Sequence, residues 1–128
     1  NTGATMKSIE NVDSPIILIA GGKDKKGNYE PLGRLIKKKV KFSILIGESK
    51  TKIRSALKDY NNVEDAETLE GAVNKAFAKA TAGDVILLSP ACSSFDMFQD
   101  YEERGNVFKK AVSTLRKNNN CPGRTQIA

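Results

Sequence analysis

The chain has 128 residues, enough for one domain, and its 21 Lys and Arg residues against 15 Asp and Glu residues give a formal net charge of +6. With 39% hydrophobic and 28% charged residues it has the composition of a globular protein, which argues against disorder. The chain contains no histidine, so a Ser-His-Asp triad, a Cys-His pair or a His-ligated metal site cannot be built from it alone.

The cysteine content and the hydropathy of the sequence indicate where in the cell the protein is located. Cys92 and Cys121 match neither a disulfide framework nor a paired-cysteine metal motif. No apolar run is long enough to span a bilayer, and the first residues lack the basic-then-apolar pattern of a signal peptide. We therefore expect a cytoplasmic protein that is not bound to a membrane.

Apolar runs alternate with helical stripes through the first half of the chain. After a short N-terminal helix, the apolar run at residues 16–20 predicts a strand buried on both faces, as in a parallel sheet. Apolar residues at helical spacing follow over residues 32–36, and a second apolar run at residues 42–46 predicts another strand. Residues 53–57 carry the next helical stripe.

The second half continues this alternation. Residues 61–66 form at best a weak short strand, and Thr68 is placed to cap a helix whose stripe over residues 69–77 is the clearest in the chain. Residues 85–88 predict a third buried strand, and a last helix is expected to begin near Phe95. The residues on one face of that helix are Phe108, Ala111, Val112 and Leu115.

This order of elements predicts an α/β fold of Rossmann-like type, with a mostly parallel sheet and helices on both faces. We place the domain at residues 1–116. Residues 117–128 have lost the helical period and are polar and rich in turn formers, so we expect a loose tail there.

The loop at residues 21–29 follows the first predicted strand. Gly21 and Gly22 let the backbone turn tightly and approach a ligand, and lysines in the loop favour an anion. The spacing matches neither the dinucleotide-binding nor the triphosphate-binding glycine motif, and no other segment supplies one. The pattern alone leaves two interpretations open, a turn with solvated lysines and an anion-binding loop.

The loop at residues 87–96 joins the third strand to the last helix through small and hydroxyl residues. Ser94 stands where an N-cap belongs, and Asp96 lies in the first turn, where a carboxylate suits the helix dipole. The free N–H groups of a helix start, together with a serine hydroxyl, can hold a carboxylate or phosphate. A capped helix and an anion site are both compatible with this pattern, and Cys92 is expected to be a small buried residue.

The basic run at residues 37–41 has two interpretations. It could indicate nucleic-acid binding. A solvated helix end, where cations suit the dipole, is the interpretation we favour, because the few aromatic residues do not interleave with the charges as on a base-stacking surface.

Three stretches match the pattern of one known family. They are residues 15–25, which contain the Gly-Gly pair, residues 69–73 (LEGAV), and residues 83–108, which contain SPACSSFDMF and then Glu-Arg-Gly. The last stretch is highly specific. Over residues 1–115 the sequence resembles the Mur ligases, and among them the C-terminal domain of the members that add D-glutamate.

The resemblance implies an ATP-dependent ligase of peptidoglycan precursor synthesis. Such enzymes use ATP and Mg2+ to phosphorylate the carboxylate of UDP-N-acetylmuramoyl-L-alanine, and the amine of D-glutamate then attacks the acyl phosphate. For this chain the resemblance implies the domain that binds D-glutamate and closes over ATP held mainly by a central domain.

The resemblance also assigns three substrate-binding residues by position. Ser94 looks like the hydroxyl residue that holds one carboxylate of D-glutamate, Lys25 looks like the basic residue that faces the other, and Tyr101 stands where the family has an aromatic residue, usually Phe. A cation at one end and N–H and O–H donors at the other suit a dicarboxylate whose amine must stay available for attack. We expect no catalytic residue and no metal ligand within the chain.

The start of the chain departs from the family, in which an Asp-Ser-Lys-Ala-Thr-Asn motif opens the domain. Placing Asn1 at the end of that motif keeps the spacing to Pro15 without a gap, and we favour this alignment. Placing residues 1–5 on the motif would replace its Lys with Gly3. In both alignments the domains that bind UDP and ATP lie outside the sequence, so we expect this chain to be inactive alone and the full enzyme to be a monomer.

The alternative hypothesis is a stand-alone Rossmann-like module that binds an anion or nucleic acid. It accounts for the fold and the charge but leaves the SPACSSFDMF segment to chance. An independent enzyme is the weakest hypothesis, because the sequence holds no complete catalytic constellation.

Overall fold

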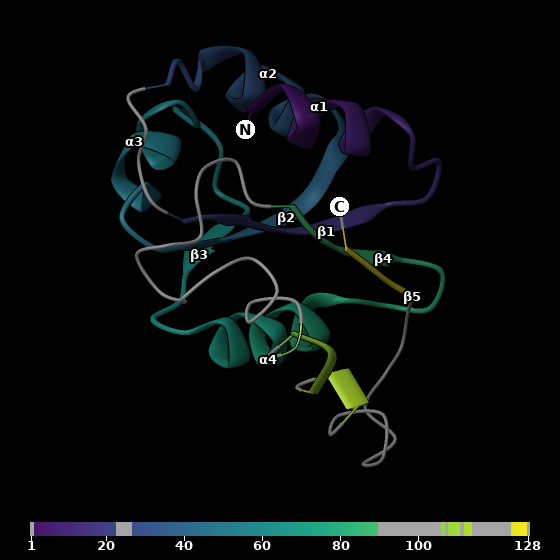
Figure 1. The fold of residues 1–128 in the computed structure, drawn as a ribbon. Helices are drawn as coiled ribbons and strands as arrows, with labels where there is room; N and C mark the ends of the chain where they lie inside the picture. Colours follow the sequence, from purple (N-terminus) through teal and green to yellow (C-terminus); the bar gives the residue numbers. More distant parts are fainter. Residues whose placement is uncertain are drawn as a thin grey trace.

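The computed structural model describes residues 2–22, 27–89, 106, 108–110, 112 and 113, and the backbone of residues 124–127. It shows one sheet lying between two layers of helices (Figure 1). The strands are β1 (Ile16–Gly21), β2 (Val40–Ile46), β3 (Val63–Asp65), β4 (Val85–Leu88) and β5 (Arg124–Ile127). The helices are α1 (Thr2–Glu10), α2 (Glu30–Lys39), α3 (Lys50–Ser55) and α4 (Leu69–Lys79).

The sheet has five strands in the order β3-β2-β1-β4-β5, and every neighbouring pair is parallel. The first strand in the sequence is therefore the central one, with β2 on one side and β4 on the other. The apolar runs predicted these three strands because a parallel sheet covered on both faces buries every side chain of its inner strands. β1 and β4 are buried along their whole length. The predicted α/β fold with a parallel sheet is confirmed.

Side chains of each inner strand alternate between two cores. Ile16, Leu18 and Ala20 of β1 pack in the core beneath α1, α2 and α3. Ile17 and Ile19 point to the other face and pack with α4. Figure 1 shows α1, α2 and α3 on one side of the sheet and α4 on the other, which confirms helices on both faces.

Helix α4 begins as the sequence predicts. The Thr68 side chain accepts a hydrogen bond from the Gly71 amide at 3.0 Å, so one of the unpaired N–H groups of the first turn is satisfied. The apolar stripe of α4 lies against the sheet, with Ala72, Val73 and Ala76 fully buried. The cap therefore marks the start of α4, and the apolar stripe marks the face that α4 buries.

Helices α2 and α3 approach each other closely at Gly33. A Cβ atom built on Gly33 would lie 2.3 Å from the carbonyl oxygen of Ala56, just after α3. A glycine inside a helix ordinarily lowers stability compared with alanine. At this position a larger residue would collide with Ala56, so the packing requires glycine.

The tail contains a strand that the sequence analysis missed. Residues 124–127 form β5 and pair in parallel with β4, from Val85↔Arg124 to Leu88↔Ile127. The prediction of a loose tail over residues 117–128 is wrong for this part, and the sheet continues past residue 116, where we placed the end of the domain. An edge strand needs backbone pairing on one side only, so it carries no continuous apolar run to reveal it.

Part of the predicted last helix is also seen. The described residues 106, 108–110, 112 and 113 are helical, and Phe108 and Val112 are buried in the core beneath α4, as the stripe predicted. Phe95, Ala111 and Leu115 lie outside the described residues. Within the described part of the chain, none of the helices combines the length and the apolar character that crossing a membrane requires.

The close approach at Gly33 leads to a stability prediction. We expect Gly33→Ala to lower the free energy of unfolding by about 1–3 kcal/mol, because the new methyl group must push the Ala56 backbone away. Chemical denaturation monitored by circular dichroism measures this change. Gly71→Ala is the matched control, since its Cβ would meet only the Thr68 hydroxyl, at 3.2 Å, and alanine favours the helix. Equal destabilisation by both substitutions would contradict the packing argument.

Candidate functional site

The two informative loops leave the sheet from neighbouring strands. The loop with Lys25 follows β1, and the loop with Ser94 follows β4. β1 and β4 pair in parallel with Ile19 opposite Leu88, so their carboxyl ends lie at the same edge. The Ser89 amide donates to the Ile19 carbonyl at 3.0 Å and continues the pairing to the point where the second loop begins.

The chain takes opposite directions after these two strands. After β1 it runs into α2, which packs on one face of the sheet, and after β4 it leads to the helical residues Phe108 and Val112 on the other face. In open α/β sheets, ligands bind outside the carboxyl ends of the strands, at the point where the direction of the connections changes. The edge shared by β1 and β4 is that point in this fold.

Backbone contacts fix the start of the first loop. The Gly22 amide donates to the Ile46 carbonyl at 3.1 Å, and the Ser49 amide donates to the Gly22 carbonyl at 3.0 Å. Gly21 has a φ of 136°, and a Cβ built on it would lie 1.9 Å from the Ile46 oxygen. Only glycine fits here, and Gly22 also has a positive φ, 127°, so both residues of the Gly-Gly pair suit the close approach of the end of β1 to the end of β2.

Ser49 is the residue at this edge that the sequence analysis missed. It is fully buried, and its hydroxyl has no hydrogen-bond partner among the residues that the structure describes. Its position follows from the length of β2 and of the turn at Gly47, which has a φ of 78°. A single serine two residues after a glycine gives no pattern that sequence analysis could have used.

The predicted substrate-binding residues Lys25, Ser94 and Tyr101 all lie outside the described residues, as do Cys92 and Cys121. The structure places side by side the ends of β1 and β4, after which the loops with Lys25 and Ser94 begin. The roles of the three side chains stay predictions that rest on the resemblance.

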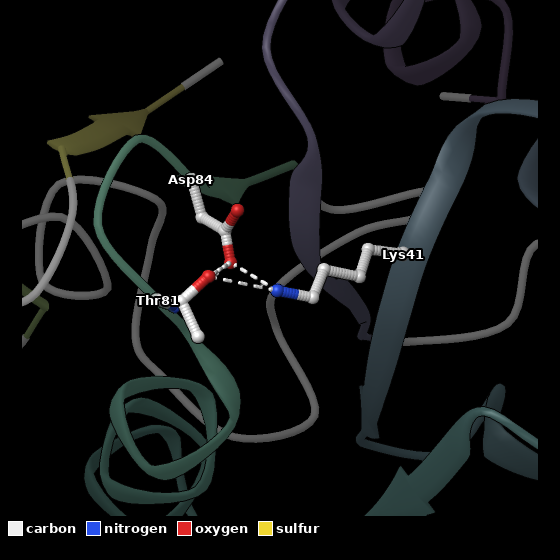
Figure 2. Close-up of polar contacts among 3 residues, drawn as sticks. All are labelled: Lys41, Thr81 and Asp84. Carbon is white, nitrogen blue, oxygen red and sulfur yellow. Dashed lines mark hydrogen bonds and ion pairs between the residues drawn. The ribbon is translucent and has the colours of Figure 1, made fainter.

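At the opposite, amino edge of the sheet, Lys41, Thr81 and Asp84 form a polar cluster (Figure 2). The Lys41 ammonium lies 2.7 Å from an Asp84 carboxylate oxygen and donates to the Thr81 hydroxyl at 3.1 Å. That same carboxylate oxygen accepts the Thr81 amide at 2.9 Å. The pairing of β1 with β2 shifts at this point, since Ile16 lies opposite Val40 and Ile17 opposite Phe42. Lys41 is thus the extra residue of a bulge, which redirects its side chain toward Asp84.

Asp84 is 3% exposed, and its carboxylate is held in the ionised form. Burial alone would raise its pKa, but the hydrogen bonds from Lys41 and Thr81 and the positive charge of Lys41 outweigh burial and lower the pKa below its usual value. The cluster ties the start of β2 to the turn before β4, across the central strand. The role of the cluster is structural, because Lys41, Thr81 and Asp84 form their hydrogen bonds with one another.

The rest of the basic run ends a helix, as we favoured from the sequence. Lys37, Lys38 and Lys39 form the last turn of α2 and are exposed. Lys41, in contrast, belongs to strand β2 and has an acidic partner, and the sequence analysis predicted neither. In the described part of the chain, no three acidic or cysteine side chains gather as metal ligands.

Comparisons with known proteins agree with the resemblance. The family model described as "Mur ligase, glutamate ligase domain" matches residues 1–92. A protein of Geobacter sp. (strain M21) named UDP-N-acetylmuramoylalanine--D-glutamate ligase is 50% identical over 117 residues, which cover 91% of this chain and 26% of that protein. The protein of the same name from Geotalea daltonii is 52% identical over 115 residues, covering 90% of this chain and 25% of the relative. The chain thus spans about a quarter of the length of the curated relatives that it matches.

The Asp84 cluster gives a pH-dependent prediction. Because the folded-state pKa of Asp84 is lowered, its carboxylate stabilises the fold at pH values above its unfolded pKa, and that contribution is lost as the pH falls through the folded pKa. We expect Asp84→Asn to cost about 1–2 kcal/mol of unfolding free energy at neutral pH. The difference between parent and variant should shrink as the pH falls below about 4.

Denaturant unfolding at a series of pH values measures this difference. Asp59→Asn is the matched control, because it removes the same charge from an exposed residue whose φ of 65° suits asparagine. A difference between parent and Asp84→Asn that stays constant down to the lowest pH would contradict the role of the ionised carboxylate.

Proposed function

Since this chain belongs to the family of Mur ligase glutamate ligase domains, we propose that it binds D-glutamate in an ATP-dependent ligase that joins D-glutamate to UDP-N-acetylmuramoyl-L-alanine. The observation that carries the proposal is the departure of the two candidate loops from neighbouring strand ends, where the connections change direction. This arrangement suits a ligand with two anionic ends, because each loop can hold one of them.

In this proposal the domain binds D-glutamate and orients its amine for the attack. Lys25 pairs with one carboxylate of D-glutamate, and Ser94 with the N–H groups around it holds the other. Tyr101 covers the carbon chain between them. With both ends held, the amine points at the activated carboxylate of the second substrate, and this orientation is the contribution of the chain to the rate.

The nucleotide chemistry is proposed to lie in the remainder of such a ligase. The sequence contains no triphosphate-binding glycine motif, and the described residues gather no set of acidic side chains that fits Mg2+. No step through the metal is therefore assigned to this chain. ATP and Mg2+ would be bound mainly by the parts of a complete ligase that this sequence does not include.

The binding roles can be tested in a full-length ligase that carries this chain as its glutamate ligase domain. We expect Lys25→Ala and Ser94→Ala each to raise the KM for D-glutamate about tenfold to a hundredfold, because each removes a charge-assisted hydrogen bond to a carboxylate. The KM values for ATP and for the UDP-linked substrate should stay close to those of the parent.

Steady-state kinetics with each substrate varied in turn measure this selectivity. Lys58→Ala is the control, because it removes one exposed positive charge from the turn after α3. Unchanged D-glutamate kinetics in both Lys25→Ala and Ser94→Ala would refute the assigned site.

The isolated chain offers a second test. We expect it to hydrolyse no ATP, with or without D-glutamate, because a complete catalytic constellation is missing from the sequence. A phosphate-release assay on the purified chain makes the measurement, with a complete ligase of the family as the positive control. ATP turnover by the chain itself would favour an independent enzyme.

A further inference from the structure

A cavity lies at the amino edge of the sheet, at the opposite end of β1 and β2 from the candidate substrate loops. Its volume is about 480 Å³, and it is widely open to solvent. Residues 12–15, which lead into β1, form one wall, and residues 38–41, where α2 passes into β2, form the other. The proposed function makes no use of this cavity.

Two of the three lysines that line the cavity are anchored. The Lys39 ammonium donates to the Glu10 carbonyl at 3.3 Å, and the Lys41 ammonium is held by Asp84 and Thr81. An ammonium group has three donors, so Lys39 keeps further donors for a ligand. Anchoring reduces the side-chain entropy that binding would otherwise cost.

The charges around the cavity and the lack of an aromatic residue indicate the class of ligand. Lys38 and Lys39 place two positive charges on the cavity against the one carboxylate of Asp13, while Asp84 offsets the charge of Lys41. A phosphate group presents several oxygen acceptors and can carry more negative charge than a halide ion, so it gains more from two ammonium groups. The described lining contains no aromatic side chain on which a nucleic-acid base could stack.

We propose that this amino-edge cavity binds a soluble, phosphate-bearing small molecule, with Lys38 and Lys39 as its cationic ligands. Asp13 weakens the binding of any anion, and the two ammonium groups of Lys38 and Lys39 outweigh its single negative charge. The site is separate from the candidate substrate edge and does not depend on the proposed ligase function.

Pyrophosphate is the probe that tests the proposal. Titration of the 15N-labelled chain, followed through its backbone amide signals, should shift signals of residues 12–15 and 38–41, with weaker binding at higher ionic strength. We expect Lys38→Ala to weaken binding about threefold to fivefold, the effect of losing one exposed charge contact. Asp13→Asn should tighten binding.

Lys37→Ala is the matched control. Lys37 is exposed in the same helical turn and carries the same charge but does not line the cavity, so its loss should change the affinity for pyrophosphate less than the loss of Lys38. Equal weakening by both variants, or signal shifts spread over the whole surface, would identify an adventitious ion only and overturn the proposal. Binding to vesicles of anionic phospholipid without binding to pyrophosphate would overturn it as well.

Discussion

The central strand β1 is apolar on both faces, and the rest of the fold follows from the need to cover it twice. Ile16 to Ala20 are fully buried, with alternate side chains in two separate cores. One helical layer cannot cover both faces, so the chain must cross from one face to the other. It does so by placing β2 on one side of β1 and β4 on the other. That crossing is also what places two loops from opposite faces at one edge of the sheet.

The edge that results is held by backbone groups. The end of β1 is joined to the end of β2 through the Gly22 amide and the Ile46 carbonyl, and the Ser49 amide adds a second contact to Gly22. Side chains would not fit at Gly21, where a Cβ would collide with the Ile46 oxygen. Among the described residues, backbone groups therefore hold the point at which the following loop begins.

The sequence predicted those parts of the fold in which burial dictates residue type. The buried strands and the Thr68 cap could be recognised because an inner strand needs apolar residues on both faces and a helix start needs an oxygen acceptor. Strand β5 could not be, because an edge strand is defined by backbone pairing and Arg-Thr-Gln-Ile carries no apolar run. The bulge that turns Lys41 toward Asp84 is also a register effect, and local sequence does not encode it. The candidate site residues stay a prediction from family resemblance, since glycine and lysine after a strand suit a solvated turn equally well.

The absence of histidine fits a domain that orients a substrate. Histidine is the side chain whose charge changes near neutral pH, which suits proton transfer. A dicarboxylate is held better by groups whose protonation is constant in that range, such as lysine, serine and backbone amides. In the proposed reaction the amine of D-glutamate attacks only after its ammonium group has lost a proton, and fixed donors that hold the two carboxylates leave that amine accessible to whichever group takes the proton. The 21 basic residues and the absence of histidine agree with the proposed role of holding D-glutamate by groups whose charge is constant near neutral pH.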